Sequence, residues 1–226
     1  MNKKIKQIIL KKNRSKIVSL TAYSKSIAKI LDKHVDIILV GDSMANVLYG
    51  QKDTHKISLE NIIQHTLSVK KGVKKSLLVV DMPKGSYDSF ESSQKNAKLV
   101  ISKTGCDAIK IESNKKNHKI IEFLVKKKIP VMGHIGYTPQ HKRKFRIEGQ
   151  TKSEINRLLL EAKAIEKAGA FSIVLECLAP DASKLITKKI GIPTIGIGSS
   201  TYCDGQILVT DDMLGLSGFY PKFVKK

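Results

Sequence analysis

The chain has 226 residues, a mass of 25.1 kDa and a formal net charge of +21, and 41% of its residues are hydrophobic. That apolar content suffices for a large core and excludes a disordered chain. No apolar stretch approaches the ~20 residues that span a bilayer. The apolar patch at residues 8–10 is too short for the core of a signal peptide. We therefore expect a cytoplasmic protein without a membrane partner.

The positive charge invites a nucleic-acid-binding interpretation. Only four of the 41 basic residues are Arg, the side chain that suits bidentate contacts with phosphates and bases. The lysines are spread along the whole chain, mostly on the polar side of helix-like stretches, which is typical of a solvated surface. We expect no nucleic-acid partner, and a nucleic-acid-binding protein is an alternative that rests on charge alone.

The cysteines Cys106, Cys177 and Cys203 are odd in number and scattered along the chain. They form neither a metal-ligand pair nor a disulfide framework, which fits a reducing compartment. We interpret Cys106 and Cys203 as structural.

Short β-rich runs recur along the chain. Most of them are near-continuous apolar runs rather than alternating ones, which is typical of parallel strands covered on both faces. The runs are 16–23, 35–40, 76–81, 107–112, 129–134, 171–176 and 192–197, with a weaker eighth at 206–210.

Amphipathic segments typical of helices lie between these runs. The clearest is 151–168, where Thr151 and Glu154 have the spacing of a capping box and Gly169 follows the last turn. Eight strands alternating with helices predict a (β/α)8 TIM barrel, a single domain over residues 1–226, and the alternative is an open doubly wound sheet. The other predicted helices are 24–33, 59–71, 89–104, 114–128 and 182–189.

Ionisable side chains stand at the ends of five successive runs. In a barrel of this kind the active site lies at the C-terminal ends of the strands. We therefore expect these side chains to converge on one mouth of the barrel. They are Asp42, Asp81, Glu112, His134 and Glu176.

Three of them, Asp42, Asp81 and Glu112, are carboxylates that such a fold brings near one another. Two such charges ~5 Å apart repel by ~3 kcal/mol at an effective dielectric of ~20, so a proton, a basic neighbour or a cation must offset them. Oxygen ligands without Cys point to a hard ion, Mg²⁺ foremost. The alternative is that Lys110 and other lysines pair with these acids.

Glu176 follows an apolar run and precedes Cys177, Leu178 and Ala179. Such flanking residues predict a desolvated carboxyl group with a raised pKa, which suits a general base, and the alternative is a buried Glu paired with a Lys. His134 lies among small neighbours, so it could donate a hydrogen bond to a substrate or simply be a packed core histidine.

Several longer segments occur in a fixed order from about residue 16 to the C-terminus. They include LTAYS (20–24), ILVGDSMANVLYG (38–50), VVDMPKGSY (79–87), IKIE (109–112), PVMGHIGYTPQ (130–140), GAFSIVLEC (169–177) and CDGQILV (203–209). Together these segments resemble the ketopantoate hydroxymethyltransferase family. The resemblance also implies a (β/α)8 barrel.

The resemblance assigns roles to individual positions. Asp42 and Asp81 match the metal-binding aspartates of the family, and Glu112 matches a third acidic position at the metal. Ser43 and Lys110 match residues that hold the keto acid, with Lys110 facing its carboxylate.

Two further positions match reactive groups of the family. His134 matches a histidine that contacts the substrate, and Glu176 matches the proposed base. The implied reaction is Mg²⁺-dependent transfer of a hydroxymethyl group from 5,10-methylenetetrahydrofolate to 3-methyl-2-oxobutanoate. It gives 2-dehydropantoate on the way to pantothenate and coenzyme A. The expected partners are the 2-oxo acid, the folate and, as in family decamers, further copies of the chain.

The sequence departs from the family pattern in the segment 140–150. It is shorter and richer in lysine than in relatives, so its role in covering the site is an open question. The chain also ends soon after PKFVK, where relatives commonly continue into another helix. The alternative function is another Mg²⁺-dependent barrel enzyme that forms 2-oxo acid enolates, such as a carbon–carbon lyase.

Overall fold

A computed structural model describes residues 2–114, 117–142, 144–218 and 221–224. Its strands follow one another in chain order around a closed barrel, and the pairs for which a register is given are parallel. This confirms the predicted (β/α)8 architecture and excludes the open sheet. The strands are β1 (Ile17–Thr21), β2 (Ile37–Val40), β3 (Leu77–Asp81), β4 (Ala108–Glu112), β5 (Val131–Gly136), β6 (Ser172–Glu176), β7 (Thr194–Ile197) and β8 (Gly205–Leu208).

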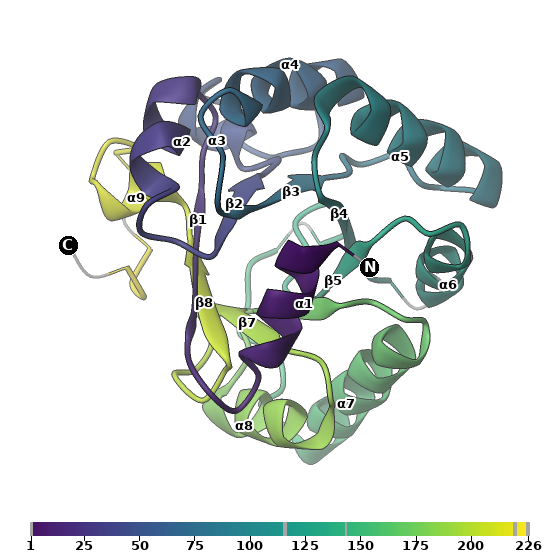
Figure 1. Cartoon of the computed structure of the whole chain (residues 1–226). Coiled ribbons are helices and arrows are strands. Elements are labelled where there is room, and N and C mark those ends of the chain that lie inside the picture. Colours follow the sequence, from purple (N-terminus) through teal and green to yellow (C-terminus); the bar gives the residue numbers. More distant parts are fainter. Residues whose placement is uncertain (1, 115–116, 143, 219–220, 225–226) are drawn as a thin grey trace. The chain divides into compact units, whose positions relative to one another are not determined.

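The helices lie between the strands in sequence (Figure 1). Every predicted helix is present, with ends that shift by a few residues. None of the helices in the described ranges is both long enough and apolar enough to cross a bilayer. They are α1 (Lys3–Leu10), α2 (Lys25–Leu31), α3 (Met44–Val47), α4 (Leu59–Lys70), α5 (Phe90–Thr104), α6 (His118–Lys126), α7 (Lys152–Lys167), α8 (Pro180–Lys189) and α9 (Thr210–Met213).

The chain divides into two compact units. One comprises Met1–Ile17 and Lys110–Gln206, and the other comprises Val18–Ile109 and Ile207–Lys226. In the first unit, α6 and α7 contact β5, and α7 also contacts β6 and α8 (Figure 1). In the second unit, α4 contacts β2 and β3 and lies between α2 and α5.

Burial explains why the strands lack an alternating pattern. Every residue of β2, β3, β4 and β5 is buried, as a strand requires when the barrel interior covers one face and helices cover the other. Strand β5 continues two residues beyond the predicted run. The reason is that Ile135 and Gly136 pair with Leu175 and Glu176 of β6, so His134 lies inside the strand rather than at its end.

The ends of α7 show how the local sequence starts and stops a helix. The Thr151 side chain accepts a hydrogen bond from the backbone N–H of Glu154, as predicted. The carboxylate of Glu154 instead accepts the N–H groups of Gly149 and Gln150, so only half of the expected capping box forms. Gly169 follows the helix with φ of +91°, a conformation that glycine adopts at little cost.

The helix α1 was not predicted. Its buried side chains, Ile5 and Ile8, are three positions apart on one face of a helix that is otherwise rich in lysine. The segment after it is anchored by Lys12, whose ammonium contacts Asp204 at 2.9 Å and the carbonyl oxygen of Thr187 at 3.1 Å. This short and highly charged helix is therefore stabilised by tertiary contacts rather than by a strong apolar pattern.

Candidate active site

Two of the predicted acids meet at the C-terminal ends of β2 and β3. Asp81 is the last residue of β3, and Asp42 follows β2 by two positions. The backbone N–H of Asp42 donates a hydrogen bond to Oδ2 of Asp81 at 3.1 Å. Their exposed fractions are 6% for Asp42 and 2% for Asp81. Parallel pairing of β2 with β3 thus places the backbone of Asp42 against the carboxylate of Asp81, although the two residues are distant in the sequence.

Gly41 leaves space beside this pair. A Cβ atom at position 41 would lie 2.9 Å from Oγ of Ser43 and 3.4 Å from Oδ2 of Asp81. A side chain at position 41 would therefore displace Oγ of Ser43 and fill the space next to the Asp81 carboxylate. Two carboxylates with space beside them suit a hard cation such as Mg²⁺, which commonly takes only one or two protein carboxylates. Within the described ranges, no group of three or more His, Cys, Asp or Glu side chains is arranged to hold a metal ion.

Ser43 is held by a tyrosine that the sequence analysis did not single out. The hydroxyl of Tyr23 lies 2.8 Å from Oγ of Ser43, within hydrogen-bond distance. Burial raises the pKa of Tyr23, so its phenol stays protonated. His65 holds the backbone of Tyr23 through a 2.8 Å contact with its carbonyl oxygen. The position of Tyr23, two residues after the C-terminal end of β1, could have indicated it, because barrel active sites lie at the C-terminal ends of the strands.

His134 lies between two acids in the other unit. Its Nε2 is 3.1 Å from Oε2 of Glu176, and its Nδ1 is 3.8 Å from Oε1 of Glu112. The side chains of His134 and Glu112 are 2% and 1% exposed, whereas that of Glu176 is 19% exposed. Glu176 is therefore only partly desolvated. An imidazolium at this place would be paired with a carboxylate on each side.

Lys110 shares a strand with Glu112. Both are buried in β4, and their separation of two residues directs them to the same face of that strand. The carboxylate of Glu112 also accepts the backbone N–H of Gln140 at 3.0 Å. Burial, and after it the negative charges of Glu176 and Glu112, raise the pKa of Tyr137.

The backbone around Glu176 adopts an uncommon conformation. Cys177 has φ of +52°, which is unusual for a residue with a side chain. Its N–H donates to the carbonyl oxygen of Ile197, and the N–H of Tyr137 donates to the carbonyl oxygen of Glu176, each at 2.8 Å. Burial raises the pKa of the Cys177 thiol to about 12. The three cysteines are buried and free, as expected for thiols outside any disulfide framework.

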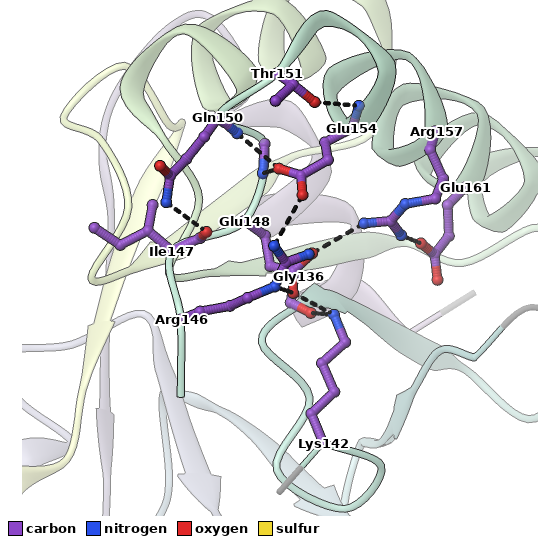
Figure 2. A network of polar contacts seen from close by, with 11 residues as sticks. Gly136, Lys142, Arg146, Ile147, Glu148, Gln150, Thr151, Glu154, Arg157 and Glu161 are labelled. Carbon is purple, nitrogen blue, oxygen red and sulfur yellow. Dashed lines mark hydrogen bonds and ion pairs between the residues drawn. The ribbon is translucent and has the colours of Figure 1, made fainter. Parts of the chain in front are cut away.

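The lysine-rich segment after β5 is anchored by one buried acid, Glu148 (Figure 2). Its carboxylate contacts Lys142, Arg146 and Arg157 at 2.9 to 3.0 Å. The ring of Phe145 packs edge-on against Tyr137, with 5.3 Å between the ring centroids. The shortened segment thus makes specific contacts beside Tyr137, although residue 143 lies outside the described residues.

The predicted site residues therefore fall into two groups. Asp42, Ser43 and Asp81 lie together in one unit, and His134 lies with Glu112 and Glu176 in the other, where Lys110 also lies. The oxygen-rich pair of the first group can hold a cation. The second group combines carboxylates with an imidazole that can move or stabilise a proton.

Comparisons with known proteins show which family this chain resembles most broadly. A sequence model of the ketopantoate hydroxymethyltransferase family matches residues 2–226. A 3-methyl-2-oxobutanoate hydroxymethyltransferase of Pelagibacter ubique (strain HTCC1062) is 53% identical over 226 residues, covering 100% of this chain and 88% of that protein. The protein of the same name from Thermococcus kodakarensis is 46% identical, covering 98% of this chain and 79% of that protein.

Similar solved structures share the fold at low sequence identity. A 2,3-dimethylmalate lyase of the PEP mutase/isocitrate lyase superfamily has a TM-score of 0.69 and 15% identity, covering 94% of this chain and 82% of that chain. A phosphonopyruvate hydrolase in complex with oxalate and Mg²⁺ also has a TM-score of 0.69, with 12% identity, covering 91% of this chain and 80% of that chain.

Proposed function

This chain belongs to the ketopantoate hydroxymethyltransferase family, and on that premise we propose that residues 1–226 act as one catalytic domain. The activity is transfer of a hydroxymethyl group to 3-methyl-2-oxobutanoate, which gives 2-dehydropantoate in the pathway to pantothenate. The proposal extends to the cofactor, the one-carbon donor and the role of each side chain.

Asp42 and Asp81 hold Mg²⁺ in this proposal, with Glu112 as the third acid of the site. Both aspartates are buried, the backbone N–H of Asp42 donates a hydrogen bond to the carboxylate of Asp81, and Gly41 places no side chain beside Oδ2 of Asp81. When bound, Mg²⁺ supplies Lewis-acid stabilisation of the negative charge that develops on a 2-oxo acid. Ser43 and Lys110 bind the keto acid, and the Lys110 ammonium neutralises the carboxylate.

Glu176 is the general base. Its carboxylate accepts the proton from carbon-3 of 3-methyl-2-oxobutanoate, and the electron pair of the broken C–H bond remains as the enolate. His134, at 3.1 Å from Oε2 of Glu176, orients this carboxylate and contacts the substrate. Because the His134 side chain is 2% exposed, a proton or charge that it holds acts in a water-poor environment, where electrostatic stabilisation is stronger.

The one-carbon donor is 5,10-methylenetetrahydrofolate. Water adds to the methylene carbon of the folate as its bonds to N5 and N10 break, and the two protons of the water pass to these nitrogens, which releases tetrahydrofolate. The enolate carbon bonds to the resulting one-carbon aldehyde, and the new alkoxide takes the proton held by Glu176, which gives 2-dehydropantoate. A carbon–carbon lyase would use the same acids but would not consume the folate. The solved lyase supports only the shared fold at 15% identity, whereas the transferases are 45–53% identical to this chain.

The observation that carries the proposal is the contact between His134 and Glu176 in a chain that matches the family over residues 2–226. The test is proton NMR of 3-methyl-2-oxobutanoate in D₂O with the full chain and Mg²⁺. We expect loss of the carbon-3 proton signal without folate, and 2-dehydropantoate once methylenetetrahydrofolate is added. Absence of both exchange and product would refute the proposed function.

We further propose that the enzyme is a homo-oligomer that acts in the cytoplasm and has no nucleic-acid partner. Light scattering coupled to gel filtration measures the subunit number. A salt titration of nucleic-acid binding tests the charge-based alternative. We expect only weak, sequence-independent binding that collapses as salt rises.

A further inference from the structure

We propose that Glu148 is a positioning residue for the carboxylate of Glu176. Glu148 lies outside the set of residues assigned to metal, substrate or proton transfer. His134 lies in β5 and Glu176 is the last residue of β6, and Glu148 contacts the segments that directly follow these two strands. The inference rests on the proposed function, since it assumes that Glu176 accepts the substrate proton.

The carboxylate of Glu148 is buried and surrounded by cations. Its side chain is 1% exposed, and it lies 2.9 Å from Nζ of Lys142, 3.0 Å from Nε of Arg146 and 2.9 Å from Nη2 of Arg157. Burial opposes ionisation, but the hydrogen bonds and charges of Lys142 and Arg146 outweigh it and hold the pKa of Glu148 below its usual value. An ionised carboxylate that pairs with several cations restrains the positions of the side chains around it, because charge-assisted hydrogen bonds are short and strong.

Lys142 connects this anchor to β5. Its ammonium contacts Oε1 of Glu148 and also donates a 2.7 Å hydrogen bond to the carbonyl oxygen of Gly136, the last residue of the strand (Figure 2). Gly136 pairs with Glu176 in the sheet, and the next residue, Tyr137, donates its N–H to the carbonyl oxygen of Glu176. Lys142 therefore restrains the strand end that is hydrogen-bonded to the backbone of Glu176.

The backbone of Glu148 connects the anchor to the segment after β6. Its N–H donates to the carbonyl oxygen of Cys177 at 2.9 Å, and its carbonyl oxygen accepts the N–H of Ala179 at 2.8 Å. Cys177 has φ of +52°, a conformation that persists only where surrounding contacts impose it. The two hydrogen bonds bracket the turn that directly follows Glu176, so they restrain the direction in which β6 ends.

The consequences for catalysis follow from geometry. A displacement of ~1 Å at a reacting group costs about 100-fold in rate. Removal of the charge at Glu148 leaves Lys142, Arg146 and Arg157 around a neutral group, and their rearrangement releases the carbonyl oxygen of Gly136. Substrate binding depends on Ser43 and Lys110 and is expected to change less than proton abstraction.

The experiment compares Glu148→Gln with the matched control Glu154→Gln. Glu154 also pairs with Arg146. Its carboxylate accepts the backbone N–H groups of Gly149 and Gln150, just before α7, rather than contacting the segment after β6. Carbon-3 exchange of 3-methyl-2-oxobutanoate is measured well below the Tm of each protein. For Glu148→Gln we expect kcat to fall about 10- to 100-fold with KM within about threefold, whereas the control keeps both values. A folded Glu148→Gln variant with wild-type kcat would overturn the proposal.

Amide hydrogen exchange separates this inference from the proposed function. We expect faster deuterium uptake at residues 177–179 in Glu148→Gln than in the wild type or in Glu154→Gln. Unchanged uptake overturns the positioning role, whatever the activity. If the wild type itself exchanges no carbon-3 hydrogen, the proposed function fails, and with it the catalytic meaning of Glu148.

If Glu148→Gln does not fold, a second variant, Lys142→Met, tests the same proposal. Lys142→Met removes only the ammonium that reaches Gly136, at a side chain that is 34% exposed and so tolerates substitution. A lower kcat with an unchanged KM in Lys142→Met supports the proposal. Wild-type kcat in this variant contradicts it.

Discussion

The backbone N–H of Asp42 donates a hydrogen bond to Oδ2 of Asp81 at 3.1 Å, although the residues are 39 positions apart in the sequence. This bond fixes the orientation of the Asp81 carboxylate relative to the end of β2. Because both residues are buried, replacement of the charge at Asp81 affects ion binding directly rather than through a mobile surface group.

We predict that Asp81→Asn weakens Mg²⁺ binding about 100-fold, since a side chain of the same size loses its negative charge at the cation. Isothermal titration calorimetry with MgCl₂ measures the change. Asp88→Asn is the control, because Asp88 is an exposed acid seven residues further along the chain. Equal affinities in the wild type and Asp81→Asn would exclude Asp81 as a ligand.

Glu176→Gln is expected to lower the rate of carbon-3 exchange by about 10²- to 10⁴-fold, the range typical of a lost general base. Calorimetric Mg²⁺ affinity should stay at the wild-type value, because in the proposed mechanism Glu176 acts as the base beside His134 and Asp42 and Asp81 hold the cation. Glu122→Gln serves as the control, since Glu122 pairs with Lys126 on an exposed face of α6. Full exchange activity in Glu176→Gln would remove this residue as the base.

Asp32 is expected to make stability depend on pH. Its carboxylate accepts the backbone N–H groups of Lys74, Lys75 and Ser76, and these bonds outweigh burial and lower the pKa of Asp32. A lowered pKa means stabilisation that is present above the unfolded-state value of ~3.9 and is lost as the pH falls through the folded-state value.

Asp32→Ala should therefore lower the free energy of unfolding at pH 7 by about 2 kcal/mol, the scale of hydrogen bonds to a charged group. Urea denaturation at pH 7 and at pH 3 measures the difference from the wild type. We expect that difference to shrink at pH 3, because the Asp32 carboxylate of the unfolded chain is then largely protonated and folding must remove that proton. A pH-independent difference would show that the charge of Asp32 is not the stabilising feature.

Gly136→Ala is predicted to destabilise the fold strongly. Gly136 has φ of +97°, and an added Cβ would overlap the carbonyl oxygen of Glu176 and Cδ1 of Leu178. Gly50→Ala is the matched control, because Gly50 also has a positive φ but nothing lies near the added Cβ. We expect a loss of about 1 kcal/mol in the control and at least about 3 kcal/mol in Gly136→Ala. Similar urea midpoints for the two variants would contradict this steric argument.

The thiols should react slowly in the native protein. Burial raises the pKa of Cys106 to about 11 and that of Cys177 to about 12, so little thiolate exists at pH 8. Labelling with Ellman's reagent should be slow at pH 8 and quick in urea. Its rate in the native state should still rise between pH 9 and pH 10. A plateau near pH 8.5 would indicate an exposed, unperturbed thiol.

The strands were predictable because their pattern is local. Burial on both faces demands continuous apolar runs such as residues 76–81 and 171–176, and each of these runs contains a strand, β3 and β6. Asp81 and Glu176 could be named as site candidates because each is the charged residue that ends one of these runs, which is also a local feature of the sequence. The length of β5 was not predictable, because its last two residues extend the strand through pairing with β6.

Contacts between distant side chains could not be derived from the pattern. The ion pairs of Glu148 depend on the path of a segment that returns to β5 and β6, and nothing in its residue types specifies that path. The link between Tyr23 and Ser43 likewise depends on the packing of neighbouring strands.

By itself the sequence therefore predicted the barrel from hydrophobic periodicity, the family from its motifs and a set of candidate acids from the strand ends, because all of these are properties of contiguous chain. Only the tertiary structure decided which atoms meet, placing His134 beside Glu176 and Asp42 beside Asp81. Those distances arise from strand register and loop path, which are set by the packing of the whole chain rather than by any one segment.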